Sequence, residues 1–292
     1  GERVLHRFMP TPPMPSYLVA VAVGRFDTLA GAAAGVPLRL LTAEGKREQA
    51  RYALQVTRQV LPYYSDYFGI AYALPKLDQL AVAAVRRGAM EDWGLISYAE
   101  PTLLFDPARS SPGTQRVVFE IVAHEIAHQW FGNLVTAASW DEIWLNEAFA
   151  TWLAAKTTEH FNPEWQVGLH RRFDFDETMA LDAGPATRAI RSGMVSERSV
   201  WDVFDEITYV KGGAVLSMVE TWLGADTFRR GLQAYMRDRK LSNATAGDLW
   251  HAMAKVSGND VTALAASWTD QPGVPLLQVR TGNTRRSRST VS

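Results

Sequence analysis

One stretch decides the predicted fold: VVFEIVAHEIAHQWF, residues 117–131. Its apolar residues favour a buried helix, and His124 and His128 stand four residues apart on it. Side chains at this spacing share one helical face, with Cβ atoms about 5–6 Å apart, so both imidazoles can reach one tetrahedral zinc ion. Glu125 follows His124, and from there its carboxylate can take a proton from a zinc-bound water. The stretch therefore predicts two metal ligands and a general base on one helix.

A third ligand is expected from the next apolar helical segment, WDEIWLNEAFATWLAAK, residues 140–156. A catalytic zinc usually has three protein ligands and one water. Glu147 follows His128 at a distance that allows a loop and an antiparallel return helix. A carboxylate among so many aromatic residues is costly unless it is paired or binds a metal. The alternative, two histidines at chance spacing, leaves Glu147 without a partner.

Outward from these helices, the pattern divides the chain into a short β region and a long helical one. Residues 17–26, YLVAVAVGRF, and residues 77–85 have the β-branched and apolar runs typical of strands. Residues 46–68 have helical spacing, and residues 116–267 indicate successive helices between Gly, Pro and Asn breakers. We expect an α+β fold in which a small β-sheet is followed by a mostly helical region.

The composition excludes several classes of partner. The 292 residues carry 30 Lys and Arg against 31 Asp and Glu, a formal charge of -1, so neither nucleic acid nor a membrane surface is expected to bind. No apolar run approaches the roughly 18 residues of a membrane span, and no signal-peptide pattern opens the sequence, which favours the cytoplasm. Cysteine is absent, which leaves His, Asp and Glu as metal ligands.

Three motifs together resemble the zinc aminopeptidases of the aminopeptidase N type, a gluzincin family. The family's zinc signature is similar to HEIAH at 124–128 with NEAFA at 146–150, its exopeptidase signature to GAMED at 88–92, and its tyrosine motif to TYVKG at 208–212. The motifs keep the family's order and separation. The resemblance implies a thermolysin-like zinc metallopeptidase catalytic domain that removes N-terminal residues from peptides with a free N-terminus.

The resemblance also implies a role for each residue of the zinc and tyrosine motifs. His124, His128 and Glu147 would hold one zinc ion (Zn2+) per chain. Glu125 would be the general base for the zinc-activated water, and would then pass the proton to the leaving nitrogen. Tyr209 would donate its hydroxyl to the oxyanion that develops on the scissile carbonyl.

The exopeptidase motif would bind the substrate. The resemblance implies that Glu91 binds the free α-ammonium and that Gly88, Ala89 and Met90 lie along the peptide. Asp92 stands where the family usually has asparagine, and we expect this exchange to alter substrate preference or affinity, because a carboxylate only accepts hydrogen bonds. A second departure, an alanine in place of glycine after the third zinc ligand, is expected to leave activity intact.

Members of this family are longer than this chain, so the resemblance divides it into three parts. Residues 1–27 resemble the end of an N-terminal β domain and residues 28–272 the catalytic domain. Residues 273–292 resemble the start of a β-sandwich domain or form a disordered tail. Flanking domains of a longer chain would then be missing, which would open the cleft and weaken amine recognition.

Other activities remain open at this point. An endopeptidase on the same scaffold would gain nothing from an amine-binding Glu91, and an epoxide hydrolase would need a long apolar channel. A non-catalytic or weakly active truncated module of the same fold would be expected to lose a ligand or the base, whereas all are present here. The preferred N-terminal residue, the metal in the cell and the oligomeric state do not follow from the motifs.

Overall fold

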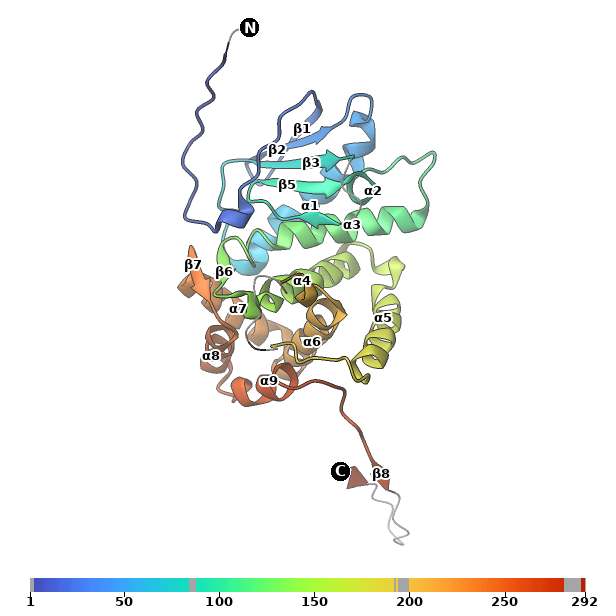
Figure 1. Ribbon diagram of the computed structural model, residues 1–292, viewed down its shortest axis with the longest axis vertical. Coiled ribbons are helices and arrows are strands. Elements are labelled where there is room, and N and C mark those ends of the chain that lie inside the picture. Colours follow the sequence, from blue (N-terminus) through green and yellow to red (C-terminus); the bar gives the residue numbers. More distant parts are fainter. Residues whose placement is uncertain (1–2, 84–87, 192, 194–199, 281–289, 292) are drawn as a thin grey trace.

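The computed structural model describes residues 3–83, 88–191, 193, 200–280 and 290–291. A β-sheet lies at one end of the molecule with helix α2 at its side and helices α1 and α3 beneath it, and helices α4 to α9 make up the part of the molecule below these (Figure 1). This arrangement, a small sheet followed by a mostly helical region, confirms the α+β prediction.

The sheet has five strands in the order β1-β2-β3-β5-β4. Their bounds are Asp27–Ala33, Val36–Thr42, Leu77–Val82, Leu95–Ala99 and Ala89–Met90 in that order. Strands β2, β3 and β5 are parallel, whereas β1 and β4 pair antiparallel at the two edges. Because β4 is the last strand of the sheet, its outer edge has no strand partner among the described residues.

Two helices cover one face of this sheet and form its core. Helix α1, Arg51–Phe68, buries one side and ends at Gly69, whose φ of 65° is the left-handed conformation that favours glycine. The predicted helix over this segment is confirmed, and it continues through Pro62 as one element. Helix α3, Pro112–Ala127, packs beside it and begins at Ser111, whose Oγ accepts from Thr114 N at 3.2 Å. The short helix α2, Glu100–Leu103, precedes it.

The helical region continues the same core. Its helices are α4 Trp144–Phe161, α5 Val167–Asp182, α6 Gly212–Leu223, α7 Ala225–Arg239, α8 Ala246–Ser257 and α9 Val261–Thr269. Two short pairs of strands accompany them, β6 Val135–Ala137 with β7 Ser242–Ala244 and β8 Val279–Arg280 with β9 Thr290–Val291. Phe131 and Phe149 stack at 4.0 Å between ring centroids, which joins the end of α3 to α4.

Helices α4 and α6 approach each other very closely. A Cβ atom built on Gly212, the first residue of α6, would lie only 2.7 Å from Ala148 Cβ. Only glycine fits at such a crossing. The turn before α6 is therefore held against the start of α4.

The strand predicted for residues 17–26 is wrong. The structure has a short 3-10 helix, Ser16–Leu18, followed by extended chain that pairs with no strand among the described residues. Val19, Val21 and Val23 are 62%, 81% and 92% exposed. A β-branched run forms a strand only where another strand supplies its hydrogen bonds, and none of the strands in the described ranges does so there. Among the described residues, no helix has the length and apolar character needed to cross a membrane.

Candidate metal centre and substrate cavity

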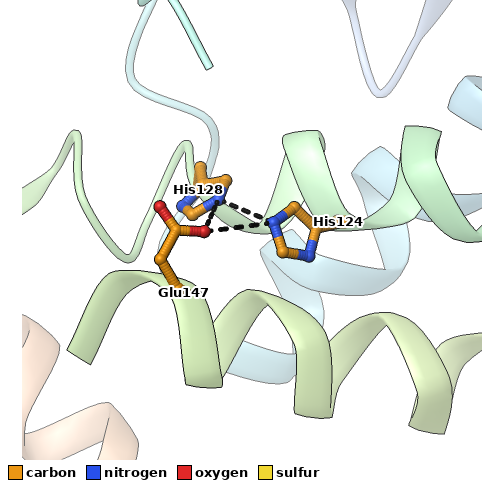
Figure 2. Close-up of side chains that lie close together, drawn as sticks. All are labelled: His124, His128 and Glu147. Carbon is orange, nitrogen blue, oxygen red and sulfur yellow. Dashed lines mark hydrogen bonds and ion pairs between the residues drawn. The ribbon is translucent and has the colours of Figure 1, made fainter. Parts of the chain in front are cut away.

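The predicted ligands come from two packed helices. His124 lies in the last turn of α3, His128 directly follows that helix, and Glu147 lies in the first turn of α4. Figure 2 shows the two imidazoles and the carboxylate pointing toward one another across this contact. Helical spacing places the histidines on one face, while the packing of α4 along α3 brings the glutamate to them.

The three side chains are close enough to share one ion. Glu147 Oε2 lies 3.4 Å from Nε2 of His124 and 3.4 Å from Nε2 of His128, and the two Nε2 atoms are 3.0 Å apart. The carboxylate side chain is 6% exposed and the His128 side chain 1%. Two imidazoles and one carboxylate with a common focus are the donor set of a catalytic zinc site.

A backbone contact orients the second histidine. Nδ1 of His128 lies 3.0 Å from the carbonyl oxygen of Phe131, which can only accept, so Nδ1 carries a proton and donates it. Nε2 is then the nitrogen that faces Glu147, and it can bind a metal ion once its own proton has left. Metal-binding histidines are commonly held in this way by a carbonyl on the other ring nitrogen.

The buried charged groups around His128 and Glu147 favour the binding of a cation. Burial acts to lower the pKa of His128, but the negative charges of Glu91 and Glu147 outweigh it and raise this pKa to about 10. Burial acts to raise the pKa of Glu147, but the charge of His128 and the hydrogen bonds from both histidines hold it well below its usual range. Burial lowers the pKa of His124. A buried carboxylate that attracts positive charge this strongly fits a divalent ion.

Glu125 is a buried carboxyl group without a hydrogen-bond partner on one oxygen. Its residue is 5% exposed, and Oε2 has no partner among the described residues. Burial raises its pKa well above the usual range; the charge of His128 opposes this, and Glu91 and Glu147 add to it. An unpaired carboxyl oxygen on a cavity wall beside the ligands can exchange a proton with a reactant placed there.

Glu91 follows the edge strand β4 and is tied to the end of α3. Its backbone carbonyl accepts from Asn133 Nδ2 at 2.8 Å and from Gln129 Nε2 at 3.4 Å. Its side chain lines the cavity, and a carboxylate oxygen of Glu91 lies within 4.8 Å of ligand atoms of Glu125 and His128. Burial is the main cause that raises the pKa of Glu91. The sequence motif therefore ends beside the metal centre.

The residues before Glu91 line the same cavity. Ala89 and Met90 pair with Tyr98 and Ser97 of β5, and no described strand pairs with the other edge of β4, which an extended ligand could therefore join. Gly88 has a φ of 72°, and nothing lies within 4 Å of a Cβ built on it. This open, left-handed position is the one place in the motif that requires glycine for its backbone.

Tyr209 lies on a turn of π-helix, Ile207–Lys211, directly before α6. Its ring stacks on His124 with centroids 6.1 Å apart and planes inclined by 19°. Burial raises the pKa of Tyr209, and the carboxylate of Glu147 adds to this, so the phenol keeps its proton and can donate it in a hydrogen bond. Single π-helical turns are frequent at functional sites.

Two residues that the sequence interpretation missed support this turn. The Arg188 guanidinium donates to both carboxylate oxygens of Asp205, at 3.1 and 2.5 Å, and to Thr208 Oγ1 at 2.7 Å. Asp205 Oδ1 accepts in turn from Thr208 N at 3.1 Å. An aspartate three positions before a threonine amide is a helix-capping pattern that could have identified Asp205, whereas nothing local in the sequence pairs Arg188 with it.

The three candidate ligands, Glu125, Tyr209 and residues 88–91 all line one cavity of about 1370 Å³. The wall also includes side chains that were not predicted, among them Tyr17 and Arg171. The Tyr17 ring packs against Trp140 with centroids 5.8 Å apart, and its hydroxyl lies 3.5 Å from Asn146 Nδ2. The N-terminal segment therefore contributes a side chain to the cavity, from its short 3-10 helix Ser16–Leu18.

Comparison with known proteins agrees with this geometry. The profile of the peptidase family M1 domain matches residues 52–268. Aminopeptidase M1-A of Oryza sativa subsp. japonica is 41% identical over 274 residues, which cover 94% of this chain and 31% of that protein. Probable aminopeptidase 1 of Sulfurisphaera tokodaii is 37% identical over 96% of this chain and 36% of its own length. Leucyl aminopeptidase of Saccharolobus solfataricus is 36% identical over 98% of this chain and likewise 36% of its own length. The chain thus spans about a third of the curated relatives it matches.

Proposed function

The chain belongs to peptidase family M1, and from this premise we propose that it carries the catalytic site of a zinc aminopeptidase, a hydrolase that removes N-terminal residues from peptides. The observation that carries the proposal is the convergence of His124, His128 and Glu147 in a cavity that also holds Glu91 and Glu125. A metal-ligand set alone would fit many hydrolases. The buried acid at the end of an edge strand favours an exopeptidase over an endopeptidase, because it can bind a free amine.

We assign one zinc ion per chain to the two histidines and Glu147. Zinc suits this donor set, and when bound it supplies Lewis-acid polarisation of the scissile carbonyl and a lowered pKa for water. The residues present fit the ion on two counts: the three donor atoms share a focus, and the fixed Nδ1 proton of His128 leaves Nε2 free to bind.

The remaining groups bind and orient the peptide and move its protons. The Glu91 carboxylate binds the substrate α-ammonium, and β4 pairs with the peptide backbone through its open edge. Glu125 accepts a proton from the attacking water and gives it to the leaving nitrogen. Tyr209 donates its hydroxyl hydrogen to the oxygen of the carbonyl under attack, where negative charge develops.

The division of the chain is part of the same proposal. We assign residues 28–272 to the catalytic domain, residues 1–27 to the end of a preceding β domain and residues 273–292 to the start of a following one or to a tail. This is supported by the matched range, 52–268, and by exposed apolar side chains on the flanking segments, such as Val23 at 92% and Leu276 at 94%. Exposed apolar residues in a row are typical of a surface that another part of a protein covers.

The test combines metal content with turnover by this chain and its Glu125→Gln variant. We expect about one zinc per chain in both proteins, and hydrolysis of leucyl p-nitroanilide by the unaltered chain alone. Loss of a general acid or base usually costs about 100- to 10,000-fold in rate. An N-acetylated leucyl substrate should not be cleaved. Normal turnover by the glutamine variant, or equal cleavage of the blocked substrate, would show that the assignment is wrong.

A further inference from the structure

Four charged side chains on the cavity wall have no place in the mechanism above, and Arg171 differs from the other three in having a buried charged nitrogen without a hydrogen-bond partner. Arg171, on α5, lies on the cavity wall together with Arg116, Glu120 and Asp174. Arg116 lies 3.9 Å from Glu120 in an ion pair along α3. Arg171 has no hydrogen-bond or ion-pair partner among the residues that the structure describes, and its Nη2 is fully buried. Burial lowers its pKa.

The guanidinium packs on an aromatic ring, and the charges of Asp174 and Glu120 act on it without a direct ion pair. Its Cζ lies 5.1 Å from the centroid of the Phe175 ring, a cation–π contact that orients the plane but supplies no hydrogen-bond acceptor. A guanidinium stays protonated at any ordinary pH, and a partly buried charge is costly when it has no hydrogen-bonded partner. Arg171 is therefore a charged side chain that packs on an aromatic ring and whose buried Nη2 has no hydrogen-bond acceptor among the described residues.

The position of Arg171 relative to the metal ligands follows from α4. A Cβ built on Gly213 would lie 3.6 Å from Arg171 Nη2 and 3.9 Å from Thr151 Cγ2. Arg171 and Thr151 thus both lie close to Gly213 and both line the cavity, and Thr151 is one helical turn beyond Glu147, a rise of about 6 Å along α4. An extended peptide advances about 3.4 Å per residue, so this distance corresponds to the first or second residue beyond the scissile bond.

Helix α3 indicates on which side of the metal ligands Arg171 lies. At one end of the centre, Gln129 contacts the backbone of Glu91, the acid proposed to bind the substrate amine. At the other end, Glu120, one turn before His124, lies close enough to Arg171 for their charges to interact. Glu91 and Arg171 therefore flank the metal ligands from opposite sides.

We propose that Arg171 forms a subsite for a carboxylate on the leaving side of the peptide, either an acidic side chain on the residue after the scissile bond or the C-terminal carboxylate of a dipeptide. The proposal rests on the aminopeptidase function given above. Neither neighbouring carboxylate forms an ion pair with Arg171: Glu120 is paired with Arg116, and Asp174 is exposed to solvent. A guanidinium can bind a carboxylate through two parallel hydrogen bonds, which favours it over an amide of the same shape.

Turnover of matched substrate pairs tests the proposal. One pair is leucyl-glutamic acid amide and leucyl-glutamine amide, and the other is leucyl-glycine and leucyl-glycine amide. A charged hydrogen bond of this kind is worth about tenfold or more in kcat/KM, so at least one acid should exceed its matched amide by that factor. Preference in the first pair identifies a side-chain carboxylate, and preference in the second a terminal one. Arg171→Gln should remove the preference, whereas Arg172→Gln, an exposed neighbour on α5, should retain it.

A binding measurement separates this proposal from the proposed function. The Glu125→Gln chain, loaded with zinc, is titrated calorimetrically with the same four peptides, with and without Arg171→Gln. If no substrate is hydrolysed but an acid binds about tenfold more tightly than its amide in an Arg171-dependent way, the subsite stands and the proposed activity fails. If leucyl p-nitroanilide is hydrolysed while both pairs differ less than about twofold, or Arg171→Gln leaves the difference intact, the subsite is refuted and the activity stands.

Discussion

Asp92→Asn should stabilise the protein at neutral pH, and the size of the effect should depend on pH. Asp92 is 7% exposed, and burial raises its pKa to about 6 from an ordinary value of 3.8. The hydroxyl of Ser97, which donates to Asp92 Oδ2 at 2.9 Å, opposes this rise, and the charge of Glu91 adds to it. The folded state therefore prefers the neutral carboxyl group.

The sign and magnitude follow from linkage. Between pH 3.8 and about 6 the folded state binds more protons at Asp92 than the unfolded state does, so stability falls as the pH rises through this window. The difference of about two pKa units corresponds to a cost of at most about 3 kcal/mol above pH 6, at 1.36 kcal/mol per unit, and solvent screening of the charge reduces it. Asparagine cannot ionise, and its side-chain oxygen can still accept from Ser97, so the variant escapes this cost.

Urea unfolding of both proteins at several pH values measures the effect. The free energy of unfolding of Asp92→Asn should exceed that of the unaltered chain by up to about 3 kcal/mol at pH 8, and this advantage should shrink toward pH 4. Asp176→Asn, at an exposed position on α5, is the matched control and should show no such trend. An Asp92→Asn advantage that is the same at pH 4 and pH 8 would refute the reasoning.

Two further variants test the support of the site. Gly212→Val should lower the free energy of unfolding by about 1–3 kcal/mol, because its side chain would overlap Ala148, and urea unfolding should detect this; an unchanged midpoint would contradict the close crossing of α4 and α6. Arg188→Gln should lower kcat for leucyl p-nitroanilide by about tenfold or more with little change in KM, because Tyr209 lies on the turn that Arg188 and Asp205 hold. An equal loss through KM alone would indicate a role in substrate binding instead.

The wrong strand prediction shows that local amino-acid composition does not by itself establish whether a segment forms a strand. Residues 17–26 have strand-like composition, yet Val19, Val21 and Val23 are exposed and the segment pairs with no described strand. Strand formation depends on a partner elsewhere in the chain, whereas a helix closes its hydrogen bonds within itself. Helix α1 could therefore be predicted from spacing alone, including its end at Gly69.

The sequence by itself determined the α+β class and the pairing of His124 with His128, because helical spacing places residues four apart on one face whatever surrounds them. Only the tertiary structure decided which acids meet these histidines. Glu91 follows strand β4, Glu147 lies in the first turn of α4 and Arg171 lies on α5. Their meeting in one cavity therefore depends on packing between distant segments. The same packing raises or lowers the pKa of each group, because burial and neighbouring charge exist only after the chain has folded.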